Sequence, residues 1–260
     1  MPELPEVETV VRSLSRPLAG RKIVSAEFNS KHVTPGNREK LAEQISGRTI
    51  ESIRRRGKFI VMTLDQGFLS IHLGMTGKLL LEAPRTPYTH GVFTLDRGTL
   101  IYDDPRQFGK IEWSPKRIEK LGPEPLEITL KSFLNRLKVR KTRIKSLLMN
   151  QTFLAGLGNI YVDEALFAAG IHPLAIASRI SAPRAARLHQ AIQETLKLAI
   201  EHRGSSISDY VDGEGNRGFF QVMHRVYGRT DEPCLKCATS IKRIVVGQRG
   251  THFCPTCQKR

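Results

Sequence analysis

The chain has 260 residues, of which 41 are Lys or Arg and 25 are Asp or Glu, so its formal net charge is +16. It is long enough for one large domain or two ordinary ones, and it has neither a run of 18 apolar residues nor a basic-then-apolar leader, which predicts a soluble intracellular protein without a membrane span. The excess of cations favours a polyanionic partner, usually nucleic acid, although a ribosome-bound or merely basic protein has the same charge.

The first predicted element is a helix over residues 1–16. Pro5 suits the first turn of a helix, and Glu6 and Glu8 complement its positive N-terminal end. Apolar residues then recur at helical spacing, as expected for a buried stripe. A capped helix start therefore explains the segment from Pro5 onward without invoking catalysis.

The residues before Pro5 indicate chemistry. Once Met1 is removed, Pro2 carries a free secondary amine, which can attack a sugar aldehyde carbon. Three carboxylates lie within six residues of this amine, so a nucleophile and candidate acid/base groups occur together in sequence. Helix capping accounts neither for Glu3 nor for a proline at position 2.

Between about Lys22 and Ser114 the pattern changes to period two, with β-branched and aromatic residues. Turn signals such as Asp104-Pro105 separate the segments, and only Arg38–Ile45 has helical spacing. Many short strands at close spacing predict a β-sandwich or barrel. The predicted strands are Ile23–Phe28, Thr49–Arg55, Phe59–Leu64, Phe68–Leu73, Lys78–Glu82, Val92–Leu95, Thr99–Tyr102 and Lys110–Trp113.

The segment Leu121–Leu126 contains two prolines that break any continuing element, which predicts a linker. Beyond it the apolar spacing becomes helical. Asn159 and Ser181 are expected N-caps, and Gly204 is an expected C-terminal stop. The predicted helices are Ser132–Leu137, Arg143–Met149, Asn159–Ala169 and Pro183–His202.

Basic residues concentrate in three separate segments. Lys131–Asn150 contains seven basic residues and no acid, Pro233–Arg260 contains no acid, and Arg54–Lys58 is a third cluster. A solvated charged face explains any one of these segments. The three together predict a surface that follows a phosphate backbone at several points.

A glycine turn, Leu154–Asn159, joins two of the predicted helices. Gly156 and Gly158 allow backbone N–H groups to approach a phosphate, which would then lie at the positive end of the helix that Asn159 opens. Helical hairpins often turn on glycine without any ligand. The basic run Lys138–Lys145 just before the turn favours duplex binding.

All four cysteines lie near the end of the chain, in the pairs Cys234–Cys237 and Cys254–Cys257, which 16 residues separate. This spacing is typical of a zinc ribbon. Two disulfides are the alternative, which an intracellular chain without further cysteines disfavours. Four thiolates leave no open position on the metal, so we expect one structural Zn²⁺.

Between the cysteine pairs, Ile241–Val246 and Gln248–Phe253 are predicted to form two strands around Gly247. Arg249 then lies near the hairpin tip. There it could enter a groove or bind a phosphate, or simply be solvated.

Motifs distributed over the whole chain carry a resemblance to a known family. They are Pro2–Glu8, Ile71–Gly77, Asp104–Gly109, Leu121–Leu126, Gly158–Tyr161, Ala168–Pro173, Val226–Arg229 and the four cysteines. In this order they resemble the formamidopyrimidine-DNA glycosylase family, bacterial repair enzymes that excise oxidised purines. Few of these motifs are specific singly, but together they are very specific.

The resemblance implies an α+β fold with a structural Zn²⁺ and damaged double-stranded DNA as the partner. It implies an N-terminal helix and β-sandwich catalytic domain over residues 1–122, and a linker over 123–134. A helical DNA-binding domain with a helix-two-turn-helix follows over 135–224, and a zinc finger over 225–260. It also implies a monomer without membrane association in the bacterial cytoplasm, associated with the nucleoid through DNA binding.

By resemblance, the activity is base excision followed by cleavage of the abasic strand by β,δ-elimination. Pro2 would attack C1′ of the damaged nucleotide and form an iminium, with Glu3 as the acid/base partner. Glu6 would support the sugar and base. Lys58, by itself a plain exposed lysine, matches a lysine beside the damaged nucleotide and its phosphates. Arg249 matches an arginine of the zinc hairpin near the active site, and we expect it to belong to the catalytic residues with Pro2, Glu3 and Lys58.

The resemblance also implies residues that bind DNA. Met75, Arg106 and Phe108 match a trio that fills the void left by an extruded nucleotide, although Met75 and Phe108 taken alone would be core residues. Lys145 and Asn159 match residues that bind phosphate beside the lesion. The resemblance further assigns substrate or DNA binding to His72, His90 and Tyr227.

Residues Ser205–Gln221 resemble a lesion-capping loop, whose glycines allow it to order on binding. Two rival interpretations remain. Relatives of the endonuclease VIII type remove oxidised pyrimidines, but they tend to begin Pro-Glu-Gly-Pro-Glu, whereas this chain has Leu4. A non-catalytic zinc-ribbon protein that binds nucleic acid would need neither Pro2 nor Glu3 nor Lys58.

Overall fold

The computed structural model describes residues 2–207 and 210–260, so Met1 and two residues of the predicted lesion-capping loop lie outside the described part. The chain divides into two compact units. Unit 1 comprises Met1–Glu119 and Ile200–Gln221, and unit 2 comprises Lys120–Ala199 and Val222–Arg260. Among the described residues, no helix is both long and apolar enough to cross a membrane.

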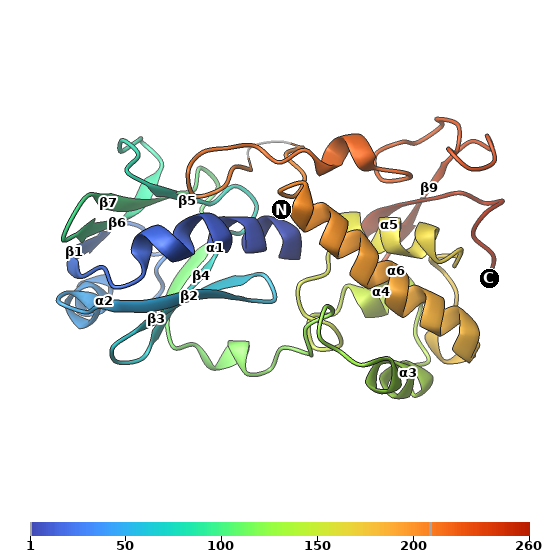
Figure 1. Ribbon diagram of the computed structural model, residues 1–260, viewed down its shortest axis with the longest axis horizontal. Helices are drawn as coiled ribbons and strands as arrows, with labels where there is room; N and C mark the ends of the chain where they lie inside the picture. The colour runs from blue at the N-terminus through green and yellow to red at the C-terminus, as the bar shows by residue number, and fades with distance from the viewer. Residues whose placement is uncertain (1, 208–209) are drawn as a thin grey trace. The chain divides into compact units, whose positions relative to one another are not determined.

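Unit 1 begins with the helix α1 (Leu4–Leu18), drawn in blue in Figure 1. The helix starts later than predicted because Glu3 is its N-cap, with an extended backbone, and forms a capping box with Glu6. Pro5 lies in the first turn as predicted. The predicted apolar stripe is buried and packs mainly on β2, so the helical interpretation of this segment is confirmed.

Two four-stranded antiparallel sheets make up the rest of unit 1, with strand orders β1-β6-β7-β5 and β2-β3-β4-β8. One hydrophobic core contains side chains from α1 and from both sheets, which confirms the predicted sandwich. The helix α2 (Arg38–Ile45) has the predicted bounds. The strands are β1 (Ile23–Phe28), β2 (Ile50–Arg56), β3 (Phe59–Leu64), β4 (Phe68–His72), β5 (Lys78–Leu81), β6 (Thr89–Leu95), β7 (Thr99–Asp103) and β8 (Lys110–Trp113).

Unit 2 is helical, with α3 (Leu130–Lys138), α4 (Ile144–Leu148), α5 (Asn159–Ala168) and most of α6 (Ala182–Glu201). The prediction that Asn159 caps α5 is wrong: Gly158 is the N-cap and Asn159 is the first helical residue. Its side chain instead bonds to residues outside α5. Ser181 directly precedes α6 as expected, and Gly204 lies beyond its end with a φ of +76°, in the left-handed region.

The chain ends in the hairpin β9 (Lys242–Val246) and β10 (Arg249–Phe253), where Gly247 and Gln248 form the turn. A small core of Phe167, Val226, Ile241, Cys234 and Cys254 joins this module to α5. Short 3₁₀ helices complete the described structure: η1 (Lys116–Ile118), η2 (Ala177–Arg179) and η3 (Phe220–Met223).

Candidate active site

The start of the chain forms a buried group of polar residues. Pro2 is buried, and Glu3 and Glu6 are only 3% and 2% exposed. The Glu6 carboxylate accepts the backbone N–H of Glu3 at 2.7 Å and that of Ser205 at 2.7 Å. Its contact with Gly204 is so close that a Cβ there would lie 2.6 Å from Glu6 Oε1. Glu6 therefore fixes the N-terminal residues and ties them to the segment after α6.

Lys58 lies in the turn between β2 and β3 and is only 6% exposed, so the alternative of a plain exposed lysine is wrong. Phe59 follows Lys58 in the chain, and it is paired with His72 in the β3–β4 ladder. Burial, and then the positive charges of Lys58, Arg117 and Lys110, lower the pKa of His72 to about 4. Its Nδ1 accepts the Gly74 N–H at 3.1 Å, so His72 is neutral at pH 7 with its proton on Nε2.

Two neighbouring loops of unit 1 carry Met75, Arg106 and Phe108. Met75 is 40% exposed and Phe108 is 52% exposed, so the alternative that they are core residues is wrong. The Arg106 guanidinium lies 4.7 Å from the centre of the Phe108 ring. The structure thus brings apolar, aromatic and cationic side chains together on two adjacent exposed loops.

Asp104 joins these two loops. It is completely buried, and its carboxylate accepts hydrogen bonds from Thr76 Oγ1 at 2.6 Å, Gly109 N at 2.8 Å and Arg106 N at 3.3 Å. The loops touch so closely that a Cβ on Gly74, whose φ is +60°, would lie 2.5 Å from Gly109 N. One carboxylate therefore sets the relative position of the loop with Met75 and the loop with Arg106 and Phe108.

In unit 2, Lys145 and Asn159 come together as predicted. Lys145 is completely buried, and its Nζ donates to Asn159 Oδ1 at 2.6 Å and to Asp163 Oδ1 at 2.5 Å. The amide of Asn159 in turn donates to the backbone oxygen of Gly250 at 2.9 Å. These bonds explain why Asn159 does not cap its helix. They join α4, α5 and the hairpin into one polar group.

The hairpin tip lies beside this group. Arg249 is exposed at the first position of β10. A Cβ on Gly247 would lie 3.1 Å from the hydroxyl of Ser146 on α4. From β10, His252 donates its backbone N–H to Asp163 Oδ2 at 2.9 Å. Asp163 therefore serves both the buried lysine and the hairpin.

The four cysteine sulfurs lie within 4.8 Å of one another. Their sulfur–sulfur separations include 3.9 Å for Cys234–Cys257, 3.5 Å for Cys237–Cys254 and 3.5 Å for Cys237–Cys257. A tetrahedral zinc thiolate site with Zn–S bonds of about 2.3 Å has sulfur separations of about 3.8 Å. The donor set therefore fits one structural zinc ion with no open position, as predicted, and not two disulfides.

Comparison with known proteins matches the chain almost throughout. Residues 1–111 match the model of the formamidopyrimidine-DNA glycosylase N-terminal domain, residues 121–211 that of the H2TH domain of the same enzymes, and residues 231–260 the zinc finger found in FPG and IleRS. The formamidopyrimidine-DNA glycosylase of Solibacter usitatus is 61% identical over 265 residues, and that of Bacillus subtilis is 43% identical over 275 residues; both alignments cover 100% of each chain.

Solved structures agree with these matches. A mutant FPG of Lactococcus lactis, in complex with a Fapy-dG containing DNA, superposes with a TM-score of 0.91 at 39% identity over 100% of both chains. The FPG protein of Thermus thermophilus gives a TM-score of 0.90 at 39% identity, covering 99% of this chain and 98% of that one. The chain belongs to the formamidopyrimidine-DNA glycosylase family.

Within this family fold, the helix pair α4–α5 lies inside the matched H2TH domain, so the predicted helix-two-turn-helix is confirmed. The glycine turn differs in detail from expectation, because the Gly156 N–H donates to Gln151 Oε1 at 2.8 Å. The Gln151 side chain thus satisfies a backbone group that we expected to face a phosphate.

The predicted lesion-capping loop of the family folds onto unit 1 in its described part. The Tyr210 hydroxyl donates to the backbone oxygen of Glu6 at 3.1 Å, and burial raises the pKa of Tyr210. Gly213 bonds to α1 and β5 through Ser13 Oγ at 2.9 Å and the Leu81 N–H at 2.9 Å. The loop is therefore linked to the helix that carries Glu6.

The remaining predicted residues lie in different places. His90, on β6, is half-buried, and its Nδ1 lies 3.0 Å from Asn29 Oδ1. Tyr227 is in unit 2, where its ring centre lies 5.1 Å from that of His252. His90 thus bonds to the segment that follows β1, whereas Tyr227 adjoins the polar group around Asp163.

The sequence did not predict a role for three buried acids, which are Asp104, Asp163 and Glu164. Glu164 accepts the backbone N–H groups of Arg225, Val226 and Tyr227 at 3.0, 2.9 and 2.9 Å. It therefore positions the segment with Tyr227. Adjacent acids in an otherwise apolar helix, as in α5, were the available signal.

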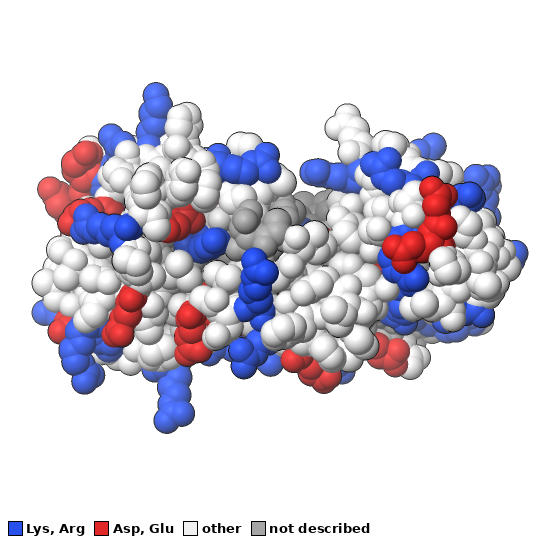
Figure 2. All heavy atoms as spheres, turned by 90° about the horizontal axis from the view of Figure 1, so that it is seen from above, with Lys and Arg blue, Asp and Glu red and all other residues white. Residues whose placement is uncertain are grey.

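Lys and Arg side chains are spread along the whole face shown in Figure 2, whereas Asp and Glu form smaller separate groups. This distribution accords with the net charge of +16. Such a surface attracts a polyanion at long range and at many points.

Proposed function

We propose that this protein is a base-excision-repair DNA glycosylase that removes oxidised purines, such as 8-oxoguanine and formamidopyrimidines, from duplex DNA and cleaves the abasic strand. Family membership over the whole chain, together with the buried group of Pro2, Glu3 and Glu6, is the observation that carries this proposal. The protein would act as a monomer on damaged DNA, in the cytoplasm of a bacterium and on its nucleoid.

Pro2 is proposed as the nucleophile, with its amine freed by removal of Met1. The neutral nitrogen attacks C1′, and the damaged base leaves with the bonding electron pair and takes up a proton. Loss of the remaining amine proton and opening of the sugar ring leave a cationic iminium. This electron sink then permits loss of a proton from C2′ and elimination of the 3′ phosphate, followed by the 5′ phosphate. N-terminal amines titrate near ~8, so a useful fraction is neutral at pH 7.

Glu3 and Lys58 are proposed to assist the reaction of Pro2 in different ways. Glu3, which directly follows the nucleophile, would transfer protons during ring opening. Lys58 would provide positive charge for the phosphates of the damaged nucleotide. Glu6 would support the sugar and base, and its bonds to Glu3 and Ser205 hold the N-terminus in place. His72, neutral and donating from Nε2, would bind DNA without a charge of its own.

Base excision requires the damaged nucleotide to leave the helix, which costs a few kcal/mol of stacking and pairing. Met75 and Phe108 are proposed to fill the resulting void, and Arg106 to hydrogen-bond the orphaned base. The support is their exposure on two loops that Asp104 holds together. A flexible thioether and a flat ring suit a gap between base pairs.

In unit 2, Asn159, Arg249 and Tyr227 are proposed to bind DNA phosphates. Lys145 would act indirectly, because its buried ammonium already bonds to Asn159 and Asp163. It would orient the Asn159 amide and place a positive charge near the phosphate. The zinc ion would hold the hairpin that carries Arg249. His90 is proposed as a further DNA contact in unit 1.

Cleavage of matched duplexes tests the proposed substrate class. One duplex carries a single 8-oxoguanine and the other a single oxidised pyrimidine, with identical flanking sequences. We expect strand cleavage at 8-oxoguanine to be the faster by at least about tenfold, which corresponds to about 1.4 kcal/mol in activation free energy. Faster cleavage at the pyrimidine would assign the endonuclease VIII activity instead, and binding without cleavage of either would leave a non-catalytic DNA-binding protein.

A further inference from the structure

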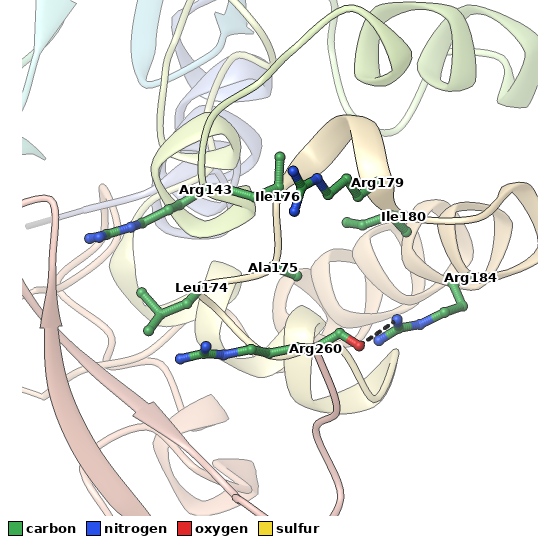
Figure 3. Close-up of a pocket in the computed structure, with 8 residues that line it drawn as sticks. All are labelled: Arg143, Leu174, Ala175, Ile176, Arg179, Ile180, Arg184 and Arg260. Carbon is green, nitrogen blue, oxygen red and sulfur yellow. Dashed lines mark hydrogen bonds between the residues drawn. The ribbon is translucent and has the colours of Figure 1, made fainter.

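A hollow of about 520 Å³ lies in unit 2, and four arginines line it (Figure 3). They are Arg143, Arg179, Arg184 and Arg260. The rest of the lining is aliphatic and contains no acidic side chain. None of Lys145, Asn159, Tyr227 and Arg249 contributes to it, so the hollow is separate from the phosphate contacts proposed above.

Three segments distant in sequence build this hollow. The segment before α4 pairs with the segment before α6 through the antiparallel bridge Arg143–Ile176 and the bond from Ala177 N to Thr142 O at 2.9 Å. The Arg184 guanidinium donates to the backbone oxygens of Lys259 and Arg260 at 2.7 and 3.1 Å. Figure 3 draws the second of these bonds as a dashed line. Hydrogen bonds between these segments therefore hold the four arginines around one hollow.

Three of the four guanidinium groups around the hollow have no acidic partner among the described residues. Arg143, Arg179 and Arg260 are exposed, and among the described residues no carboxylate forms an ion pair with any of them. Other arginines of unit 2 do have acidic partners, such as Arg229 with Glu232 at 2.8 Å. Like charges around one hollow repel one another, so an anion bound there lowers the electrostatic energy.

The lining also indicates which anion fits. Guanidinium groups match phosphate oxygens in geometry and retain their charge at every physiological pH. The aliphatic remainder, such as Ile176 and Ile180, offers neither an aromatic ring for stacking nor an uncharged donor or acceptor for a base edge. Such a lining recognises phosphates irrespective of the base, which is how proteins contact the backbone of a nucleic acid.

We propose that this arginine hollow binds backbone phosphates of DNA, as a second site that lengthens the contact of unit 2 with the duplex. The proposal rests on the proposed function only in that the polyanion is DNA. The hollow would add affinity for any sequence, damaged or not, and would leave the chemistry at Pro2 unchanged.

Binding of an undamaged duplex at several salt concentrations, measured by fluorescence anisotropy, tests the proposal. The variant Arg143→Gln/Arg179→Gln/Arg260→Gln should bind more weakly than wild type, and its log–log salt slope should be smaller by about 2 to 3, because each phosphate contact contributes about 0.9. The control variant Lys40→Gln/Arg187→Gln/Lys197→Gln loses the same charge at exposed positions outside the hollow. Equal slopes for the two triple variants would overturn the proposal.

A second arm separates DNA from free phosphate compounds. Calorimetric titration with inorganic pyrophosphate should give no more than millimolar binding by wild type. Tight pyrophosphate binding that the arginine variant loses, with an unchanged DNA salt slope, would overturn the DNA assignment and make the hollow a site for free phosphates. Borohydride trapping on abasic DNA at saturating concentration should be equal for variant and wild type. An absence of adduct in both would count against the proposed function and not against the hollow.

Discussion

Each unit contains one buried aspartate that positions functional segments, Asp104 in unit 1 and Asp163 in unit 2. The two aspartates do so through different kinds of partner. Among the described residues, Asp104 in unit 1 accepts hydrogen bonds from uncharged donors alone, namely Thr76 Oγ1, the N–H groups of Arg106 and Gly109, and the Tyr102 hydroxyl at 3.4 Å. Asp163 in unit 2 accepts from the Lys145 ammonium and from the His252 N–H. One aspartate organises neutral groups, and the other compensates a buried cation.

This difference determines how much each carboxylate contributes to the free energy of unfolding. Without its partner, Lys145 would be a buried charge, and breaking such a pair costs about 3–5 kcal/mol. Loss of a hydrogen bond among neutral groups costs about 1–3 kcal/mol when it leaves one group unsatisfied. We therefore expect the stability of unit 2 to depend on the negative charge of Asp163. The stability of unit 1 should depend on the hydrogen-bond geometry of Asp104.

Removal of zinc should have the largest effect on DNA affinity, and it should disturb unit 2, which contains Asp163. Structural zinc sites contribute about 10–16 kcal/mol to the folding of small zinc modules. Without the metal, the hairpin that supplies the His252 N–H and the Gly250 oxygen loses its anchor. DNA affinity of protein treated with a chelator and shown to be metal-free should fall at least about tenfold. Unchanged affinity would contradict the role of the hairpin.

Asp163→Asn tests the charge directly. We expect the free energy of unfolding to fall by about 3–5 kcal/mol, because the variant leaves Lys145 without a counter-ion. Urea unfolding followed by circular dichroism measures this loss. The double variant Lys145→Met/Asp163→Asn is the control, and it should recover part of the stability. A single variant as stable as wild type would disprove the interpretation of the pair.

Asp104→Asn should cost less, about 1–3 kcal/mol, because an amide retains one acceptor but meets the Gly109 N–H with a donor. Its DNA affinity should fall more than its stability suggests, since the loops with Met75 and Phe108 lose their common anchor. Urea unfolding and anisotropy with a lesion duplex measure the two effects. A larger loss of stability than for Asp163→Asn would reverse the comparison of the two aspartates.

His72 should have the smallest effect on stability near pH 7, and this effect grows as the pH falls. Its pKa is about 4 in the folded protein and about 6.5 when unfolded. Between these values the unfolded state binds a proton that the folded state does not, so stability decreases as the pH falls from about 6.5 to about 4, by about 2–3 kcal/mol. In the variant His72→Asn, which does not titrate there, thermal unfolding should depend less steeply on pH. Identical profiles would contradict the low pKa.

The sequence predicts those features that local spacing determines. The period-two strands, the helical stripe of α1 and the cysteine pairs all agree with the structure, because alternation, helical repeat and metal-ligand spacing are each local. Family motifs added the candidate site, which residue types alone left open. Met75 and Phe108 illustrate this, since their chemistry suggests a core and only the resemblance indicated exposure.

The missed features depend on contacts between distant segments. Asp163 becomes important only because Lys145, 18 positions away, packs against it. Asn159 has the composition of a helix cap, but Lys145 and Gly250, 91 positions away, take its side chain. Asp104 looks like a turn residue, although Thr76 from another loop bonds to it. Propensity does not include such tertiary contacts, so these roles could not be derived from local sequence.

The central claim is that the amine of Pro2 attacks the sugar, and a borohydride trap tests it most directly. The protein without Met1 is incubated with a duplex that carries an abasic site, in the presence of sodium borohydride, and the product is digested and analysed by mass spectrometry. We predict a reduced adduct on the Pro2 nitrogen, and none when Met1 is retained, because that nitrogen is then an amide. An adduct on a lysine such as Lys58, or no adduct from the mature N-terminus, would contradict the account.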